Sequence, residues 1–208
     1  MRYDISMPIK PGMPIYKNYP DKTPSYEVVR TFDKHSVYET NITMNLHTGT
    51  HLDFPKHTLP NGGVSTNHEL DPLIGSARVI DLTHVEEGIT KEDLMDQAIQ
   101  PGEFLLFKTK SSWDTEFNPN FIYIKESAAH YLVEQQVRGV GVDALGVERA
   151  QPGHPTHDTL LGNGVIILEG VVLKDVPEGE YKMICLPLNI EGVEALPVRC
   201  ILENESPE

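Results

Sequence analysis

Short apolar runs, separated by turn-forming residues, recur along most of the chain and predict a protein rich in β-strands. Two segments, 26–32 and 38–54, combine β-branched residues with partial alternation of polar and apolar positions, and we predict strands there. Five further runs are apolar enough for strands that are buried on both faces. These five are the segments 77–83, 102–109, 138–145, 165–173 and 181–188.

Three segments carry helical patterns instead. Thr90 stands where an N-cap precedes a helix pattern over 89–99. Segment 124–137 repeats apolar positions at helical spacing and is the clearest helix, and 157–164 predicts a short helix that ends at a glycine. The first 24 residues are rich in proline, so we expect extended chain with turns there.

Together these elements indicate a single mixed α/β domain over residues 1–208, in which strands outnumber about three helices. A hydrophobic content of 39% and a charged content of 23% are those of an ordinary globular protein. The pattern alone leaves the order of the strands in the sheet open.

The charge balance limits the partners. With 31 acidic and 17 basic residues, the chain has a formal net charge of −14. Such a surface repels phosphate backbones and anionic lipid, so we expect no nucleic-acid partner and no membrane partner, whereas a metal cation suits this field. We therefore expect a small-molecule substrate.

Localisation is predicted from two observations. The first residues lack the apolar core of a signal peptide, and no apolar run approaches the roughly 20 residues that span a bilayer. Cys185 and Cys200 could form a disulfide only if neighbouring strands bring them together, and nothing in the sequence requires this. We therefore expect free, buried thiols. Both observations favour a cytoplasmic protein.

Candidate chemistry is concentrated in HTGTHLDFPKH, residues 47–57. Side chains of an extended strand alternate between its two faces. If this segment is extended, its odd-numbered polar residues share one face and its apolar residues pack on the other. The polar residues on that face are His47, His51, Asp53 and His57.

This face suits a metal ion. Zinc and similar cations bind imidazole nitrogen and carboxylate oxygen, and catalytic sites commonly leave one position open for water. His47, His51 and Asp53 supply such a set, and Gly49 leaves room between the two imidazoles. His57 is either a further ligand or a general acid/base, because its pKa lies near neutrality. Ordinary polar strand residues are the alternative, which their number on one face disfavours.

A second candidate lies far along the chain. Glu169 is embedded in the apolar run VIILEGVVL, where an ionised carboxylate needs a basic partner, a proton or a metal ion. His157 precedes it by a short helix and a turn, which can return Glu169 to its neighbourhood. His154 competes for the same role.

The remaining polar positions are weaker candidates. Asp143 ends an apolar strand and is either a supporting residue of the site or a structural turn residue. Trp113 is expected in a loop. For four isolated histidines we expect surface or packing roles: His35, His68, His84 and His130.

With these residues in view, the chain resembles the cyclase family of metal-dependent hydrolases, which includes bacterial kynurenine formamidase and isatin hydrolase. HTGTHLDFPKH is similar to the family signature His-x-Gly-Thr-His-x-Asp-x-Pro-x-His. The similarity continues over most of the length, in the segments YDISMPIKPGMPIY, VGVDALGVE, HDTLLGNGVIILEGVVL and LPLNIEGVEALPVRCIL.

The resemblance implies a swivelling β/β/α fold and roles for individual residues. His47, His51 and Asp53 resemble the ligands of a first metal ion, and Asp53 would bridge to a second ion held by His157 and Glu169. The catalytic proton carrier would be His57. An aromatic that contacts substrate would be Tyr16, with Tyr19 as the alternative.

The implied activity is hydrolysis of an amide-type C–N bond, in an aryl formamide or a cyclic amide or imide, by metal-activated water. One or two divalent cations per chain are expected, zinc first, with manganese or iron as alternatives. Homodimers or homotetramers are implied as well. Three alternatives stay open: a lactone hydrolase, a cyclase or dehydratase on the same metal site, and a non-catalytic metal-dependent protein that binds a small metabolite.

Overall fold

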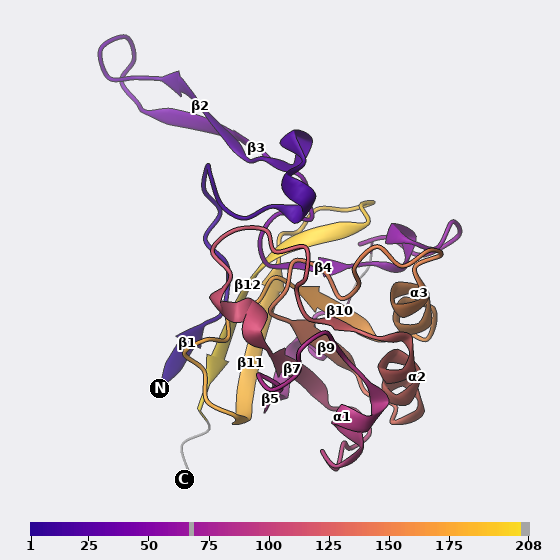
Figure 1. The fold of residues 1–208 in the computed structure, drawn as a ribbon. Helices are drawn as coiled ribbons and strands as arrows, with labels where there is room; N and C mark the ends of the chain where they lie inside the picture. Colours follow the sequence, from indigo (N-terminus) through magenta and orange to yellow (C-terminus); the bar gives the residue numbers. More distant parts are fainter. Residues whose placement is uncertain (67–68, 205–208) are drawn as a thin grey trace.

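The computed structural model describes residues 1–66 and 69–204. Its centre is a sheet with the strand order β1-β12-β11-β5-β7-β9-β10-β4, in which β4 also pairs with β12. Because of that additional pairing, seven of the strands form a closed circuit and β1 extends it at one edge (Figure 1). The strands are β1 (Arg2–Asp4), β4 (His51–Asp53), β5 (Ile74–Asp81), β7 (Phe104–Lys108), β9 (Gly139–Val142), β10 (Ile166–Glu169), β11 (Gly179–Pro187) and β12 (Ala195–Glu203).

Smaller elements surround this sheet. Two pairs of strands form small sheets, namely β2 (Ser25–Arg30) with β3 (Glu39–Thr43) and β6 (Gly88–Ile89) with β8 (Tyr123–Ile124). The helices α1 (Lys91–Met95), α2 (Glu126–Glu134) and α3 (Pro155–Gly162) cover one side of the closed sheet (Figure 1). Short 3-10 helices are η1 (Tyr16–Asn18), η2 (Pro20–Lys22), η3 (Pro55–His57), η4 (Asp71–Leu73) and η5 (Lys110–Trp113).

Successive side chains of the central strands point to opposite faces of the sheet, so the hydrophobic core has two parts. In β7, Leu105 and Phe107 pack in a cluster with residues of the helices, such as Leu132 of α2. Phe104 and Leu106 point the opposite way and join the second cluster, inside the closed sheet. These four side chains are fully buried, which explains why β7 is apolar from Phe104 to Phe107.

The predicted mixed α/β fold is confirmed, with corrections at the level of elements. The predicted strand over 38–54 is wrong in its middle, because the chain is extended only over β3 and β4 and forms a turn between them. Gly49 in that turn has φ = +69°, which an extended strand does not allow.

Two other differences have local causes. The predicted helix over 89–99 is shorter than expected: Thr90 caps it as predicted, but α1 ends at Met95, and Ala98 has φ = +48°. Strand β12 was not predicted, and Pro197 within it weakens the strand pattern. Within the described residues, no helix has the length and apolar character that crossing a bilayer requires.

Candidate metal centre

The candidate residues meet at one end of the closed sheet, where β4 lies between β10 and β12. His51 and Asp53 are two residues apart on β4 and point to the same side, whereas Leu52 between them enters the core. In the antiparallel register of β4 and β10, Glu169 lies directly opposite His51. The sheet itself therefore brings the two distant segments of the sequence together.

His47 reaches the same place from the turn before β4. The Asn45 side chain accepts a hydrogen bond from the backbone N–H of His47 at 2.9 Å, and the hydroxyl of Thr50 donates to the carbonyl of Gly170 at 2.7 Å. Gly170 approaches the turn so closely that a Cβ atom on it would lie 2.5 Å from the carbonyl oxygen of Gly49. A glycine directly after Glu169 thus allows the turn to fold against β10.

Three ligand atoms converge at the first half of the site. His47 Nδ1 lies 3.0 Å from Asp53 Oδ1 and 3.1 Å from His51 Nε2, and His51 Nε2 lies 3.4 Å from Asp53 Oδ1. Ligand atoms that share one tetrahedral ion at about 2.0–2.2 Å are about 3.3–3.6 Å apart from one another. The observed triangle is close to these separations.

The second oxygen of Asp53 faces a second set of ligand atoms. Asp53 Oδ2 lies 3.7 Å from His157 Nε2, which lies 3.4 Å from Glu169 Oε1. Glu169 Oε2 is 3.4 Å from His51 Nε2, so the two sets are continuous. The arrangement places Asp53 between two groups of ligands, each of which can hold a cation.

The two innermost histidines have fixed orientations. His51 Nδ1 lies 3.0 Å from the carbonyl oxygen of Gly49, and His157 Nδ1 lies 2.7 Å from Glu148 Oε2. An Nδ1–H that donates to these oxygens leaves Nε2 of each ring as a lone-pair donor toward the centre, the tautomer that metal sites require. Glu148 was missed by sequence reasoning, although it ends the strand-and-loop segment VGVDALGVE, where functional residues often follow a strand.

Charges in the cluster are strongly coupled. Burial opposes the charged form of each group, but Asp53 and Glu169 raise the pKa of His51 to about 10, and Glu148 and Glu169 raise the pKa of His157 to about 10. Burial and the charge of Asp53 oppose the ionisation of Glu169, yet the two histidines lower its pKa to about 2. Nearby positive charge therefore stabilises the buried carboxylates, and a divalent cation would supply it in place of the histidine protons.

The Asp53 carboxylate gives a direct test of whether a metal ion fits. Both of its oxygens are buried, and neither has a hydrogen-bond partner within the described residues. A buried, ionised carboxylate without such a partner is costly, and metal coordination is one of the few ways to satisfy it. Nitrogen and oxygen donors around these two atoms form a set that divalent transition metals accept. The residues present therefore fit a divalent metal.

His57 lies at the edge of this cluster, on η3. Its ring centroid is 4.2 Å from that of His47 and 5.4 Å from that of His157. Burial and the neighbouring histidines lower the pKa of His57, although Asp53 and Glu169 oppose this. The imidazole is therefore neutral at neutral pH and is able to accept a proton.

A pocket of about 180 Å³ opens in front of the cluster. Tyr16 lines it together with the histidines, and the Tyr16 hydroxyl contacts the carbonyl of Arg149 at 3.4 Å. Lys22 lies on the same wall, with its ammonium 5.3 Å from the centre of the Tyr16 ring. Tyr19, the alternative aromatic, is 45% exposed.

The other candidates lie elsewhere. Asp143 accepts hydrogen bonds from the backbone and side chains of Thr109 and Ser112, so it anchors the loop that carries η5. His154 precedes α3, with φ = +48° and Nδ1 3.7 Å from Glu148 Oε2, and its side chain is exposed. The weaker candidates His35, His84, His130 and Trp113 are exposed, and His68 lies outside the described residues.

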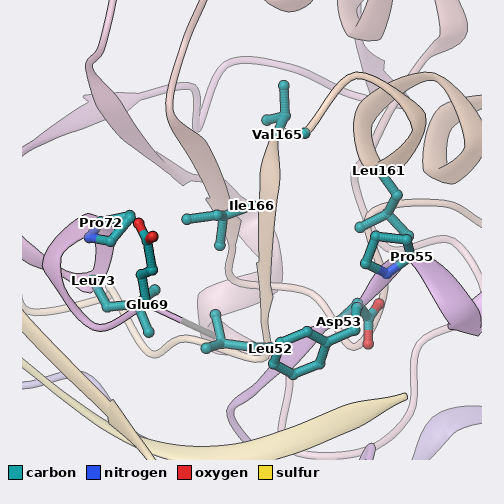
Figure 2. Close-up of a pocket in the computed structure, with 11 residues that line it drawn as sticks. Leu52, Asp53, Pro55, Glu69, Pro72, Leu73, Leu161, Val165 and Ile166 are labelled. Atoms are coloured by element: carbon teal, nitrogen blue, oxygen red, sulfur yellow. The ribbon is translucent and has the colours of Figure 1, made fainter. Parts of the chain in front are cut away.

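A larger cavity, of about 310 Å³, lies behind β4. Its wall is mainly apolar, and Figure 2 shows Leu52, Leu73 and Ile166 around it. Asp53 also lines this cavity, but its carboxylate oxygens point away from Leu73 (Figure 2). This cavity is therefore separate from the pocket that contains the ligand atoms.

Comparison with known proteins identifies the family. The family described as "Putative cyclase" matches residues 3–149. A kynurenine formamidase of Salinibacter ruber is 33% identical over 204 residues, which cover 97% of this chain and 96% of that protein.

Solved structures give the same result. A structure described as a potential metal-dependent hydrolase with cyclase activity is 47% identical, covers 100% of this chain and 99% of its own, and has a TM-score of 0.93. Isatin hydrolase A from Labrenzia aggregata, at 23% identity, covers 97% of this chain and 93% of its own with a TM-score of 0.83, and shares the fold.

Proposed function

The chain belongs to the cyclase family, and on this basis we propose that it is a metal-dependent hydrolase that cleaves an amide-type C–N bond. The family resemblance seen in the sequence is thereby confirmed. The observation that carries the proposal is the buried Asp53 carboxylate, which has no hydrogen-bond partner among the described residues and lies between two sets of imidazole and carboxylate ligands.

A divalent cation would be held by His47, His51 and Asp53, and a second one by Asp53, His157 and Glu169, whose ligand atoms face one another at 3.0–3.7 Å. When bound, such an ion lowers the pKa of a water molecule and polarises a carbonyl oxygen. We propose zinc because the site combines imidazole nitrogen with carboxylate oxygen.

Protein side chains supply the remaining steps. His57 lies beside the cluster with a lowered pKa, so it takes a proton from the attacking water and delivers it to the leaving nitrogen. Glu148 holds the ring of His157 in place through its 2.7 Å contact. The ring of Tyr16 forms an aromatic wall of the pocket, which suits a planar substrate.

We propose an aryl formamide or a cyclic amide as the substrate class. The relative named kynurenine formamidase supports the aryl formamide, and the fold shared with isatin hydrolase is compatible with the cyclic amide. A non-catalytic metal-binding protein has no need of an imidazole beside the ligand atoms that is held neutral, so the position of His57 favours an enzyme.

A cytoplasmic location also belongs to the proposal. Cys185 and Cys200 face each other on β11 and β12 and are buried, yet both are free thiols, as predicted. Free thiols in direct register are typical of a reducing compartment.

Metal content per chain, measured by elemental analysis together with turnover, tests the function. We expect about two ions in the wild type and about one in Glu169→Gln. The control is Glu87→Gln, a surface glutamate paired with Lys125, which should keep the wild-type content. Turnover is then assayed on an N-formyl aryl amine, a cyclic imide and a lactone. A wild type without metal after supplementation, or without turnover of either amide, would contradict the proposal.

A further inference from the structure

The cavity behind β4, which we call the back cavity, is large enough for a small molecule. Its volume of about 310 Å³ lies at the lower end of the range for small-molecule sites. An apolar cavity of about 150 Å³ holds a benzene molecule, so about twice that volume has room for a bicyclic ring. Size therefore makes the back cavity a candidate ligand site, and the proposed hydrolysis does not use it.

The wall of the back cavity consists mainly of apolar side chains. Leu52 of β4, Leu73 of η4 and Val165, which precedes β10, line it and are at most 4% exposed. Ile166 and Leu161 complete this part of the wall (Figure 2). A wall of this kind binds a hydrocarbon ring in preference to water, because the ring leaves water for an apolar environment.

Charge decides which ring-bearing molecules the back cavity accepts. No lysine, arginine or histidine lines it within the described part of the chain, and its two charged groups are the carboxylates of Asp53 and Glu69. The Asp53 carboxylate points into the metal centre, whereas Figure 2 shows the Glu69 carboxylate beside Pro72, on the opposite side of the cavity. In a chain of net charge −14, an anionic ligand would be repelled, and a cation would find an opposite charge at Glu69.

An apolar ring that carries one positive charge fits both properties of the wall. We propose that the back cavity binds a protonated arylalkyl amine, with its ring against Leu52, Leu73 and Ile166 and its ammonium at the Glu69 carboxylate. The leucines are buried and Glu69 is exposed, so the ring lies inside and the charge lies at the rim. Binding there does not depend on the hydrolase activity.

The back cavity shares two supporting elements with the metal centre. Leu52 lies between His51 and Asp53 on β4. Leu161 follows His157 by about one turn of α3. A bound amine therefore contacts the two elements that carry these ligands and should change turnover, a consequence that rests on the proposed function.

Three probes that share one ring test the site by equilibrium dialysis, without any activity assay. Naphthylmethylamine is the cation, naphthylmethanol is the neutral control and naphthoate is the anionic control. We expect the metal-loaded full chain to bind the amine most tightly, the alcohol more weakly and naphthoate least. Equal affinities for the amine and naphthoate, or no binding of the amine at millimolar concentration, would overturn the proposal.

Two substitutions locate the bound probe. Glu69→Gln should weaken binding of the amine about two- to five-fold, as for an exposed ion pair, and leave binding of the alcohol unchanged. Glu92→Gln is the matched control, because Glu92 is an exposed glutamate of α1 that does not line the cavity. Ile166→Phe fills the cavity and should abolish binding of both probes. Unchanged affinity for the amine in either cavity variant would overturn the proposal, and the exposed Glu69 keeps the test valid if Ile166→Phe does not fold.

Two further measurements separate the remaining outcomes. If Ile166→Phe lowers the sedimenting mass of the chain, a second copy covers the cavity and the proposal is wrong. With an N-formyl aryl amine as substrate, saturating naphthylmethylamine should change turnover by about five-fold or more in the wild type but not in Ile166→Phe. If the amine binds and turnover stays the same, the site stands and its link to the metal centre is wrong. A chain without turnover of any substrate would contradict the proposed function and leave the dialysis result unaffected.

Discussion

Two buried aspartates in this protein have opposite surroundings. Asp53 and Asp143 are 4% and 5% exposed, and each lies at or near the end of a strand of the closed sheet. Four hydrogen-bond donors of Thr109 and Ser112 surround the Asp143 carboxylate. Neither oxygen of Asp53 has a hydrogen-bond partner among the residues that the structure describes.

The difference separates a structural carboxylate from one that is suited to a cation. Burial, which its hydrogen bonds do not fully offset, raises the pKa of Asp143 to about 6. Burial also disfavours the charge of Asp53, but the imidazoles of His47 and His51 hold its pKa well below the usual range. A carboxylate that stays ionised only because imidazole nitrogens face it is one whose charge a metal ion can use in place of their protons.

Exchange of each aspartate for asparagine should give the largest contrast. Asp53→Asn removes the charge shared by both sets of ligands, so we expect loss of bound metal and a fall of turnover to background. Asp143→Asn should retain its metal, because Asp143 contacts a loop and not the cluster. Elemental analysis and turnover, measured on both variants, check this. Equal metal content in the Asp53→Asn and Asp143→Asn variants would show that Asp53 is not a metal ligand.

Within the site, a ligand and a proton carrier should respond differently. His51→Ala is expected to lose metal and activity together, because the ring nitrogen of His51 faces both Asp53 and Glu169. His57→Ala should keep its metal and lose about 10²- to 10⁴-fold in turnover, the usual contribution of a general acid/base. If His57→Ala lost metal instead, His57 would be a ligand.

The raised pKa of Asp143 predicts a pH-dependent stability. A carboxyl whose pKa is higher in the folded than in the unfolded state stabilises the fold when protonated, and this stability is lost as the pH rises through the folded pKa. Between about pH 4 and pH 7 we expect the wild type to lose on the order of 3 kcal/mol of unfolding free energy relative to Asp143→Asn. Urea unfolding at several pH values measures it, and a pH-independent difference would contradict the assignment.

The smallest effect is expected at two lysines that share one aromatic ring. The ammonium groups of Lys17 and Lys22 lie 5.2 Å and 5.3 Å from the centre of the Tyr16 ring, but Lys22 lines the pocket and Lys17 is exposed. For a substrate that carries a carboxylate, Lys22→Met should raise KM several-fold, in the range of an exposed ion pair. Lys17→Met should leave KM unchanged. Equal KM values in the two variants would show that Lys22 does not contact the substrate.

Sequence patterns predicted the parts of the fold that depend on near neighbours. The four apolar residues Phe104–Phe107 of β7 are fully buried, and Thr90 caps α1 as predicted, through hydrogen bonds with Asp93. The helix over 89–99 was predicted too long because the pattern continues past the point where the chain turns at Ala98. Strand β12 was missed for the opposite reason. Pro197 interrupts its local strand pattern, but pairing with β4 and β11 stabilises the strand.

At the site, the sequence by itself determined the kinds of ligand, because the histidines and Asp53 lie within eleven residues and their chemistry is a property of each side chain. Only the tertiary structure decided how they meet. A turn at Gly49 replaced the predicted strand and still delivered His47, through contacts with Gly170, 120 residues after Thr50. The partner of His157, Glu148, and the hydrogen bonds around Asp143 were likewise set by packing. Local patterns carry no information on these contacts, because they join segments that are neighbours in the folded chain alone.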